Sequence, residues 1–99
     1  MRSMSVDVAC AGDRLRGWRC QVRVGPEEGG PSDHEVVVSP AELASFDPDG
    51  GDPDRLVAAS FAFLLEREPP SSILRSFALS MIERFFPEYP REIRRRLAN

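Results

Sequence analysis

The chain has 99 residues and a formal net charge of −3, and 41% of its residues are hydrophobic. This length is sufficient for one domain with a single core that needs no metal or disulfide to hold it together. The mild acidity is unlike the strongly basic composition of a nucleic-acid-binding domain. We therefore expect one domain over residues 1–99, with its strands within 4–39 and its helices within 40–98.

The charged residues are segregated along the chain. Every basic residue is arginine, which together with abundant Ala, Gly, Pro and Asp is typical of a protein from a GC-rich bacterial genome. The arginines are concentrated before residue 25 and after residue 83, whereas all nine ionised residues within 25–54 are acidic. This arrangement favours ion pairs within the molecule, with self-association as the alternative.

The first residues do not combine a basic segment with an apolar one as a signal peptide does, so we predict a cytoplasmic protein. In a reducing compartment, Cys10 and Cys20 are expected to be free thiols packed within strands. Two cysteines ten residues apart, with His34 as the only histidine, do not make a zinc site. We expect neither a metal nor a cofactor.

Residues 4–10 and 17–24 alternate between apolar and polar side chains, as half-buried strands do. A third strand is predicted over 34–39. The connections, a turn at 11–14 and a mobile loop at 25–33, are short enough for an antiparallel meander. The residues expected on the inner faces are Met4, Val6, Val8, Cys10, Trp18, Cys20, Val22, Val24, Val36 and Val38.

The longest apolar stretch, residues 52–69, predicts the central helix. Asp52 is a suitable N-cap, and Pro53 fits the first helical position because its missing N–H has no partner there. Within residues 56–65 only Ser60 is polar, so we expect this helix to be buried on more than one side. The two prolines that follow end it.

Shorter helices are predicted around the central one. A capping box of Ser39 and Glu42 opens a helix before it, and a second capping box, of Ser80 and Glu83, opens one after it. Further helices are predicted over 72–77 and from Pro90 onward.

Strands followed by helices indicate an α+β domain, with a small three-stranded antiparallel meander followed by three to four helices packed on one face. Such a sheet has two edges. One of them is available to pair with a second copy of the chain.

The loop Asp47–Asp54 is rich in carboxylates, which hard cations such as calcium prefer. The spacing does not fit an EF-hand loop that begins at Asp47. Its sixth position, which must be glycine, is Asp52, and its twelfth is Ala58 instead of glutamate. We expect a polar loop that ends in a helix cap.

Aromatic residues and prolines gather near the C-terminus and precede a cluster of arginines. Aromatic side chains bordered by polar ones are typical of surfaces that bind another protein. The candidate partner-binding residues are Phe85, Phe86, Tyr89, Arg94 and Arg95. We predict a protein partner or self-association, and no membrane association.

An alternative function is nucleic-acid binding by residues 72–86, which have some features of a helix-turn-helix, together with the Arg-rich C-terminus around Arg94–Arg96. Arg84 occupies a position that is normally apolar, and Pro87 limits the second helix to about two turns, too short to lie well in a major groove. We therefore favour two short helices that fold over the core.

Catalytic machinery is not indicated by any motif. His34 is expected to point at a sheet edge, and the available nucleophiles, Cys10, Cys20 and Ser60, have no recognisable base or nucleophile elbow near them. We predict that the protein is not an enzyme. A ligand pocket beside His34, under the loop at 25–33, is a third hypothesis.

The C-terminal half resembles a segment shared by small uncharacterised bacterial proteins, in two stretches that read FLLEREPPSSILRSF and LSMIERFFPEYP. The resemblance extends from about Leu56 to Tyr89, and it implies no activity, cofactor or site. The function that we expect is that of a small, non-catalytic protein-interaction or adaptor domain.

Overall fold

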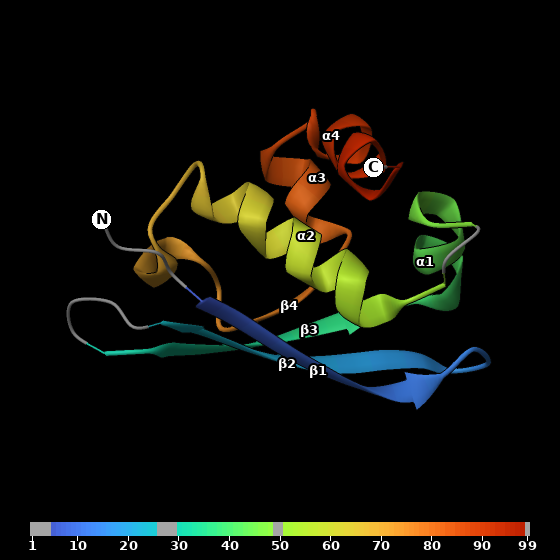
Figure 1. The fold of residues 1–99 in the computed structure, drawn as a ribbon, viewed down its shortest axis with the longest axis horizontal. Helices are drawn as coiled ribbons and strands as arrows, with labels where there is room; N and C mark the ends of the chain where they lie inside the picture. Colours follow the sequence, from blue (N-terminus) through green and yellow to red (C-terminus); the bar gives the residue numbers. More distant parts are fainter. Residues whose placement is uncertain (1–4, 26–29, 49–50, 99) are drawn as a thin grey trace.

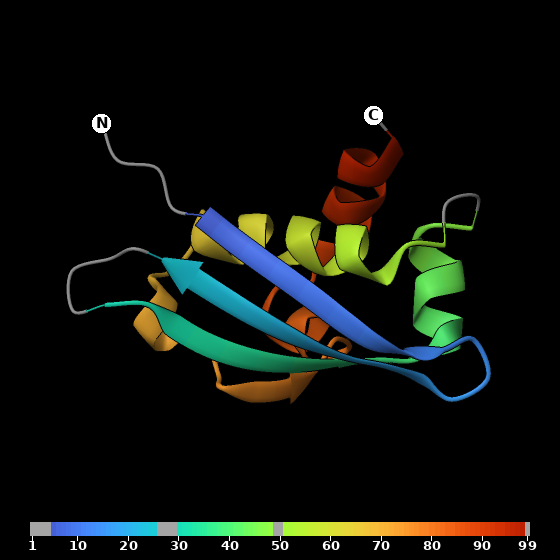
Figure 2. The same ribbon diagram turned by 60° about the horizontal axis from the view of Figure 1, so that its bottom comes forward.

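A computed structural model describes residues 5–25, 30–48 and 51–98. The chain forms a two-layer α+β domain in which the helices lie on one face of a sheet (Figure 1). No described element covers the other face, which comes forward in Figure 2. In chain order the elements are β1 (Ser5–Asp13), β2 (Gly17–Gly25), β3 (Ser32–Val38), α1 (Pro40–Phe46), α2 (Pro53–Leu65), the 3-10 turn η1 (Pro70–Ser72), β4 (Ser76–Ala78), α3 (Met81–Phe85) and α4 (Tyr89–Ala98).

The sheet has four strands in the order β1–β2–β3–β4. The first three are antiparallel and in continuous register, so that Ser5 lies opposite Gly25 and Trp18 opposite Val38. This confirms the predicted meander, although β1 continues to Asp13 through residues that were predicted to turn. β4 is parallel to β3. The sheet is therefore mixed and four-stranded, and the prediction of only three strands is wrong.

The short strand β4 takes the place of the helix predicted over 72–77. The backbone N–H of Glu35 donates to the carbonyl of Arg75 at 2.7 Å, and that of Leu79 donates to the carbonyl of Val37 at 3.0 Å. These bonds satisfy backbone groups on the edge of β3, which would otherwise be unpaired. Three residues are too few to show a strand period, so this element depends on its neighbour rather than on its own sequence.

The core lies between the sheet and α2. The predicted alternation is confirmed, because the inward side chains of β2 and β3 are buried together with one broad face of α2. Asp52 caps α2 by accepting hydrogen bonds from the N–H groups of Asp54 and Arg55. The capping box of Ser39 and Glu42 is also confirmed.

The second predicted capping box is wrong. Ser80 already has helical backbone angles and makes no side-chain cap hydrogen bond. The terminal helix α4 begins at Tyr89, one residue before the predicted proline. Among the described residues, no helix is both long and apolar enough to cross a membrane.

The uncovered face of the sheet is polar. Arg23 of β2 binds Asp33 of β3 at 2.9 Å, and Arg19 lies 3.3 Å from Glu35 on the same pair of strands. These contacts join the basic N-terminal segment to the acidic middle of the chain. They support the expectation that the segregated charges pair within the molecule.

Cys10 and Cys20 form a disulfide between β1 and β2. The two residues are direct partners in the antiparallel ladder, with their Cα atoms 3.9 Å apart. The prediction of free thiols is therefore wrong. It depended on the predicted compartment, whereas the strand register brings the two side chains together.

Three predictions concern residues that lie outside the described part of the chain. These are the inward position of Met4, the mobility of the loop at 25–33 over residues 26–29, and cation binding by the loop Asp47–Asp54 over residues 49–50.

Candidate partner-binding groove

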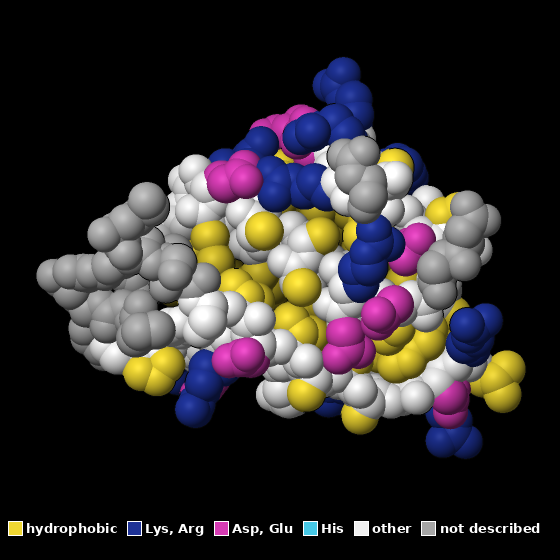
Figure 3. Space-filling model, viewed as in Figure 1, with side chains coloured by type: hydrophobic (Ala, Val, Ile, Leu, Met, Phe, Trp, Pro, Cys, Tyr) yellow, Lys and Arg dark blue, Asp and Glu magenta, His cyan; other side chains and the backbone are white. Residues whose placement is uncertain are grey.

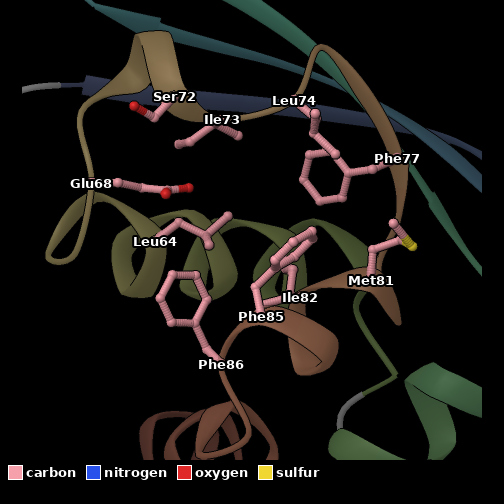
Figure 4. Close-up of a pocket in the computed structure, with 10 residues that line it drawn as sticks. All are labelled: Leu64, Glu68, Ser72, Ile73, Leu74, Phe77, Met81, Ile82, Phe85 and Phe86. Carbon is pink, nitrogen blue, oxygen red and sulfur yellow. The ribbon is translucent and has the colours of Figure 1, made fainter.

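An apolar groove lies between the segment that joins α2 to β4 and the short helix α3. It has a volume of about 420 Å³. Figure 4 shows side chains that point into it from two opposite walls, one formed by the segment around Ile73 and Leu74 and the other by α3 and Phe86. The lining residues are Leu64, Glu68, Ser72, Ile73, Leu74, Phe77, Met81, Ile82, Phe85 and Phe86.

The floor and the rim of this groove differ in exposure. Leu64, Ile73 and Ile82 belong to the core and are almost fully buried. On the rim, Leu74 is 51% exposed and Phe85 is 64% exposed. These are two of the four large hydrophobic side chains that are exposed in the described part of the chain. Exposed apolar side chains that gather around a concavity are typical of a binding site.

His34 fixes the wall that carries Leu74. Its Nδ1–H donates to the carbonyl of Leu74 at 2.8 Å, and its ring packs on Phe61 with the centroids 5.4 Å apart. Phe61 in turn contacts Phe77, which lines the groove. Because β4 is also bonded to β3, this wall is held in place from the sheet and from α2. The groove is therefore preformed in the free chain.

Among the described residues that line the groove, Glu68 is the only charged one. It follows the end of α2, where its backbone N–H donates to the carbonyl of Leu64 at 2.9 Å. Figure 4 places its carboxylate at one end of the apolar walls. A ligand with an apolar surface and one basic group matches this distribution of charge.

The structure brings together only part of the predicted partner-binding set. Phe85 and Phe86 both line the groove. Tyr89 is 1% exposed and packs edge-on against Phe63, so it belongs to the core. The two arginines lie on α4 and do not line the groove: Arg94 donates to Ser45 Oγ at 3.0 Å, and Arg95 to Glu92 at 2.7 Å.

Two of the arginines on α4, Arg95 and Arg96, form ion pairs. The hydrogen bond from Arg95 holds the pKa of the Glu92 carboxyl below its usual value, and the bond from Arg96 does the same for Glu66. Arg94 lies over the ring of Phe46, 5.0 Å from its centroid. These arginines therefore have partners within the protein.

Residues 72–86 do not form a helix-turn-helix. They contain the end of η1, the strand β4 and the five-residue helix α3. A recognition helix must extend along a major groove and cross a preceding helix. The described segment has neither property.

The prediction that His34 points at a sheet edge is wrong, because the ring is 3% exposed and lies on the inner face of β3. Its Nε2 accepts from Ser32 Oγ at 2.9 Å, the separation expected for a nucleophile and a base. However, both ring nitrogens are engaged, and these two bonds account for the burial of a polar ring. A concavity of about 600 Å³ does lie beside His34.

Two carboxylates of the loop Asp47–Asp54 have structural partners. Asp47 is buried and lies 3.4 Å from Arg55, whereas Asp52 caps α2. Among the described residues, no group of three or more acidic, histidine or cysteine side chains is placed to hold a metal.

Sequence reasoning missed Leu74, Phe77 and Met81 as members of the groove. It assigned the first two to a helix over 72–77, because proline and serine before residue 73 are typical of a helix start. Three residues are too few to show a strand period, so the sequence carries no signal for the extended segment.

The chain matches no protein-family model, and no curated protein or solved structure is significantly similar to it.

Proposed function

We propose that the protein is a small, non-catalytic interaction domain that binds an amphipathic helix of a partner protein in the groove between β4 and α3. The observation that carries this proposal is the exposure of Leu74 and Phe85 on opposite walls of a preformed apolar groove. A concave site of this kind buries apolar anchors of a ligand while its rim stays polar.

The shape of the site favours a helix over an extended peptide. A peptide that adds to a sheet needs a strand edge of some length, and β4 has three residues. A helix instead inserts side chains spaced three and four residues apart between two apolar walls. A basic residue at one end of that helix would meet Glu68, the one charged side chain that the described part of the chain contributes to the lining.

The test is capture from a lysate of the source cells at low salt, with the bound protein and the bound nucleic acid both measured. We expect one stoichiometric protein partner. Phe85→Asp and Leu74→Asp should each weaken its binding at least about 30-fold, the effect of removing a central anchor of about 2 kcal/mol. Both side chains are exposed, so the variants should keep the fold.

Leu15→Asp is the matched control, because Leu15 is 92% exposed in the turn between β1 and β2, which does not line the groove. A partner that both groove variants retain would contradict the proposal. Nucleic acid that is released by modest salt would instead support the alternative function of a regulator.

The bacterial source and the cytoplasmic location are part of this proposal. The feature that tests the location is the disulfide between Cys10 and Cys20, because such bonds are uncommon in a reducing cytosol. The test is to add a thiol-blocking reagent at the moment of lysis. If Cys10 and Cys20 react with it, the pair is reduced in the cell, as expected of a cytoplasmic protein; if they do not react, the pair is oxidised.

A further inference from the structure

β1 forms one edge of the sheet, and no described strand pairs with its outer side. It has nine residues, among which there is neither lysine nor proline, and its register with β2 is continuous, without a bulge. Edge strands are normally protected from pairing with another chain by such residues or by a bulge. The free edge of β1 is therefore suited to pair with another strand.

The register identifies the backbone groups that this edge presents. The Cα atoms of Cys10 and Cys20 are 3.9 Å apart, and close spacing is a feature of the non-hydrogen-bonded pairs of an antiparallel ladder. The N–H and C=O groups of Cys10 therefore point away from β2. By the alternation of the strand, those of Val6 and Val8 point the same way.

A second apolar surface lies directly above this edge. α2 lies over β1 and β2, and it turns Val57, Phe61 and Leu64 toward the core. Ser60 and Phe63 of α2 face Tyr89 of α4. The opposite side of α2 carries Ala58, Ala62 and Leu65, which have the spacing of one helical face and are only partly buried or exposed. Figure 3 shows hydrophobic side chains gathered across the middle of this face of the molecule.

We propose that the chain forms a two-fold symmetric dimer, in which β1 pairs antiparallel with β1 of a second copy and the two α2 helices pack side by side through Ala58, Ala62 and Leu65. The two four-stranded sheets would form one continuous sheet, and the helical layer would also continue across the two-fold axis.

The charges on β1 are compatible with this pairing. If the two-fold axis pairs Val8 with Val8 of the second copy, then Asp7 lies opposite Ala9 of that copy. If it pairs Ala9 with Ala9, then Asp7 lies opposite Ala11. In both registers the carboxylate faces an alanine instead of another carboxylate, which would be destabilising. The strand can therefore pair with itself in these two registers without opposing two carboxylates.

The residues on this side of α2 are compatible with a close contact between the helices. α2 lies mainly over β1, the strand beside the axis, so the two copies of α2 would be neighbours. Small residues such as Ala58 and Ala62 at the contact favour the close approach. An extended peptide would satisfy the edge of β1 but would leave the alanine face of α2 uncovered. A second copy covers both.

The proposed dimer leaves the groove free. The groove is formed beside β4, at the opposite edge of the sheet from β1. Two grooves on one dimer would bind two partner segments at once.

The test is the mass of the purified chain in solution, measured by light scattering after size-exclusion chromatography over a wide range of concentrations. We expect twice the mass of the chain for the wild type and a monomer for Ala62→Arg, which places a large charge in the helix contact. The matched control is Ala44→Arg, since Ala44 is an exposed alanine of α1, and this variant should remain a dimer.

A second variant tests the strand contact separately. Because the N–H of Val8 points away from β2, Val8→Pro removes a donor of the β1–β1 pairing without removing one from the β1–β2 ladder. It should be monomeric, with a circular dichroism spectrum like that of the wild type. Phe85→Asp should remain dimeric, which separates this interface from the groove. A monomeric wild type at every concentration, or Ala62→Arg and Val8→Pro proteins that both stay dimeric, would overturn the proposal.

Discussion

Replacing Tyr89 with alanine is expected to lower the free energy of unfolding by about 3–5 kcal/mol, the cost of deleting a large buried aromatic ring. The ring is 1% exposed and packs edge-on against Phe63 and Phe46. Because Ser60 Oγ donates to the carbonyl of Leu56, the Tyr89 hydroxyl donates to Ser60 Oγ, at 2.7 Å. Urea unfolding of the two proteins measures the difference.

The control is Tyr89→Phe, which keeps the ring and removes only the hydroxyl. It should cost about 1 kcal/mol, the usual value for one hydrogen bond. A Tyr89→Ala protein as stable as the Tyr89→Phe protein would show that the ring is not part of the core.

The same residue predicts how stability depends on alkaline pH. Burial raises the pKa of Tyr89 well above its usual value, and the nearby carboxylates of Glu42 and Glu83 act in the same direction. Above the pKa of the unfolded chain, near 10, the unfolded state loses this proton while the folded state keeps it. Stability is therefore complete below about pH 10 and falls above it, by up to about 1.4 kcal/mol per pH unit.

The composition makes this dependence simple to assign. The chain has no lysine and one tyrosine, and its two cysteines are joined. Tyr89 is thus the only side chain of the described residues that ordinarily titrates between pH 9 and pH 12. Tyr89→Phe should remove the fall in stability over that interval, and a fall that persists in this variant would contradict the assignment.

Removing the Cys10–Cys20 disulfide is expected to lower the free energy of unfolding by about 3 kcal/mol, because the bond restricts the unfolded chain across a separation of 10 residues. The double variant Cys10→Ala/Cys20→Ala tests this by urea unfolding. Reductant should lower the stability of the wild type to a similar level and leave the double variant unchanged. A wild type that contains two reactive thiols as purified would contradict the disulfide.

The sequence predicted those elements in which the local pattern and the tertiary structure agree. β2 and β3 alternate because one face is buried, and α2 is capped by Asp52 whatever packs against it. β4 was missed because its three residues are extended only through their bonds to β3. The disulfide was missed because strand register, which joins Cys10 to Cys20, cannot be obtained from the periodicity of single strands.

The candidate site was predicted in part for a related reason. The aromatic residues near the C-terminus indicated a surface, but Phe85, Phe86 and Tyr89 are close in sequence and differ in burial. Which ring is exposed depends on the end of α3 and the start of α4, where the chain changes direction. The opposite wall, with Leu74, comes from the segment that was predicted to be helical.

The most direct test of the groove as the binding site is hydrogen exchange of the protein, measured with and without the partner that the wild type captures. We predict that the partner slows exchange most at backbone amides of residues 72–86, which form both walls of the groove. Protection confined to α4 around Arg94, or to the uncovered face of the sheet, with no change over residues 72–86, would contradict the proposed function.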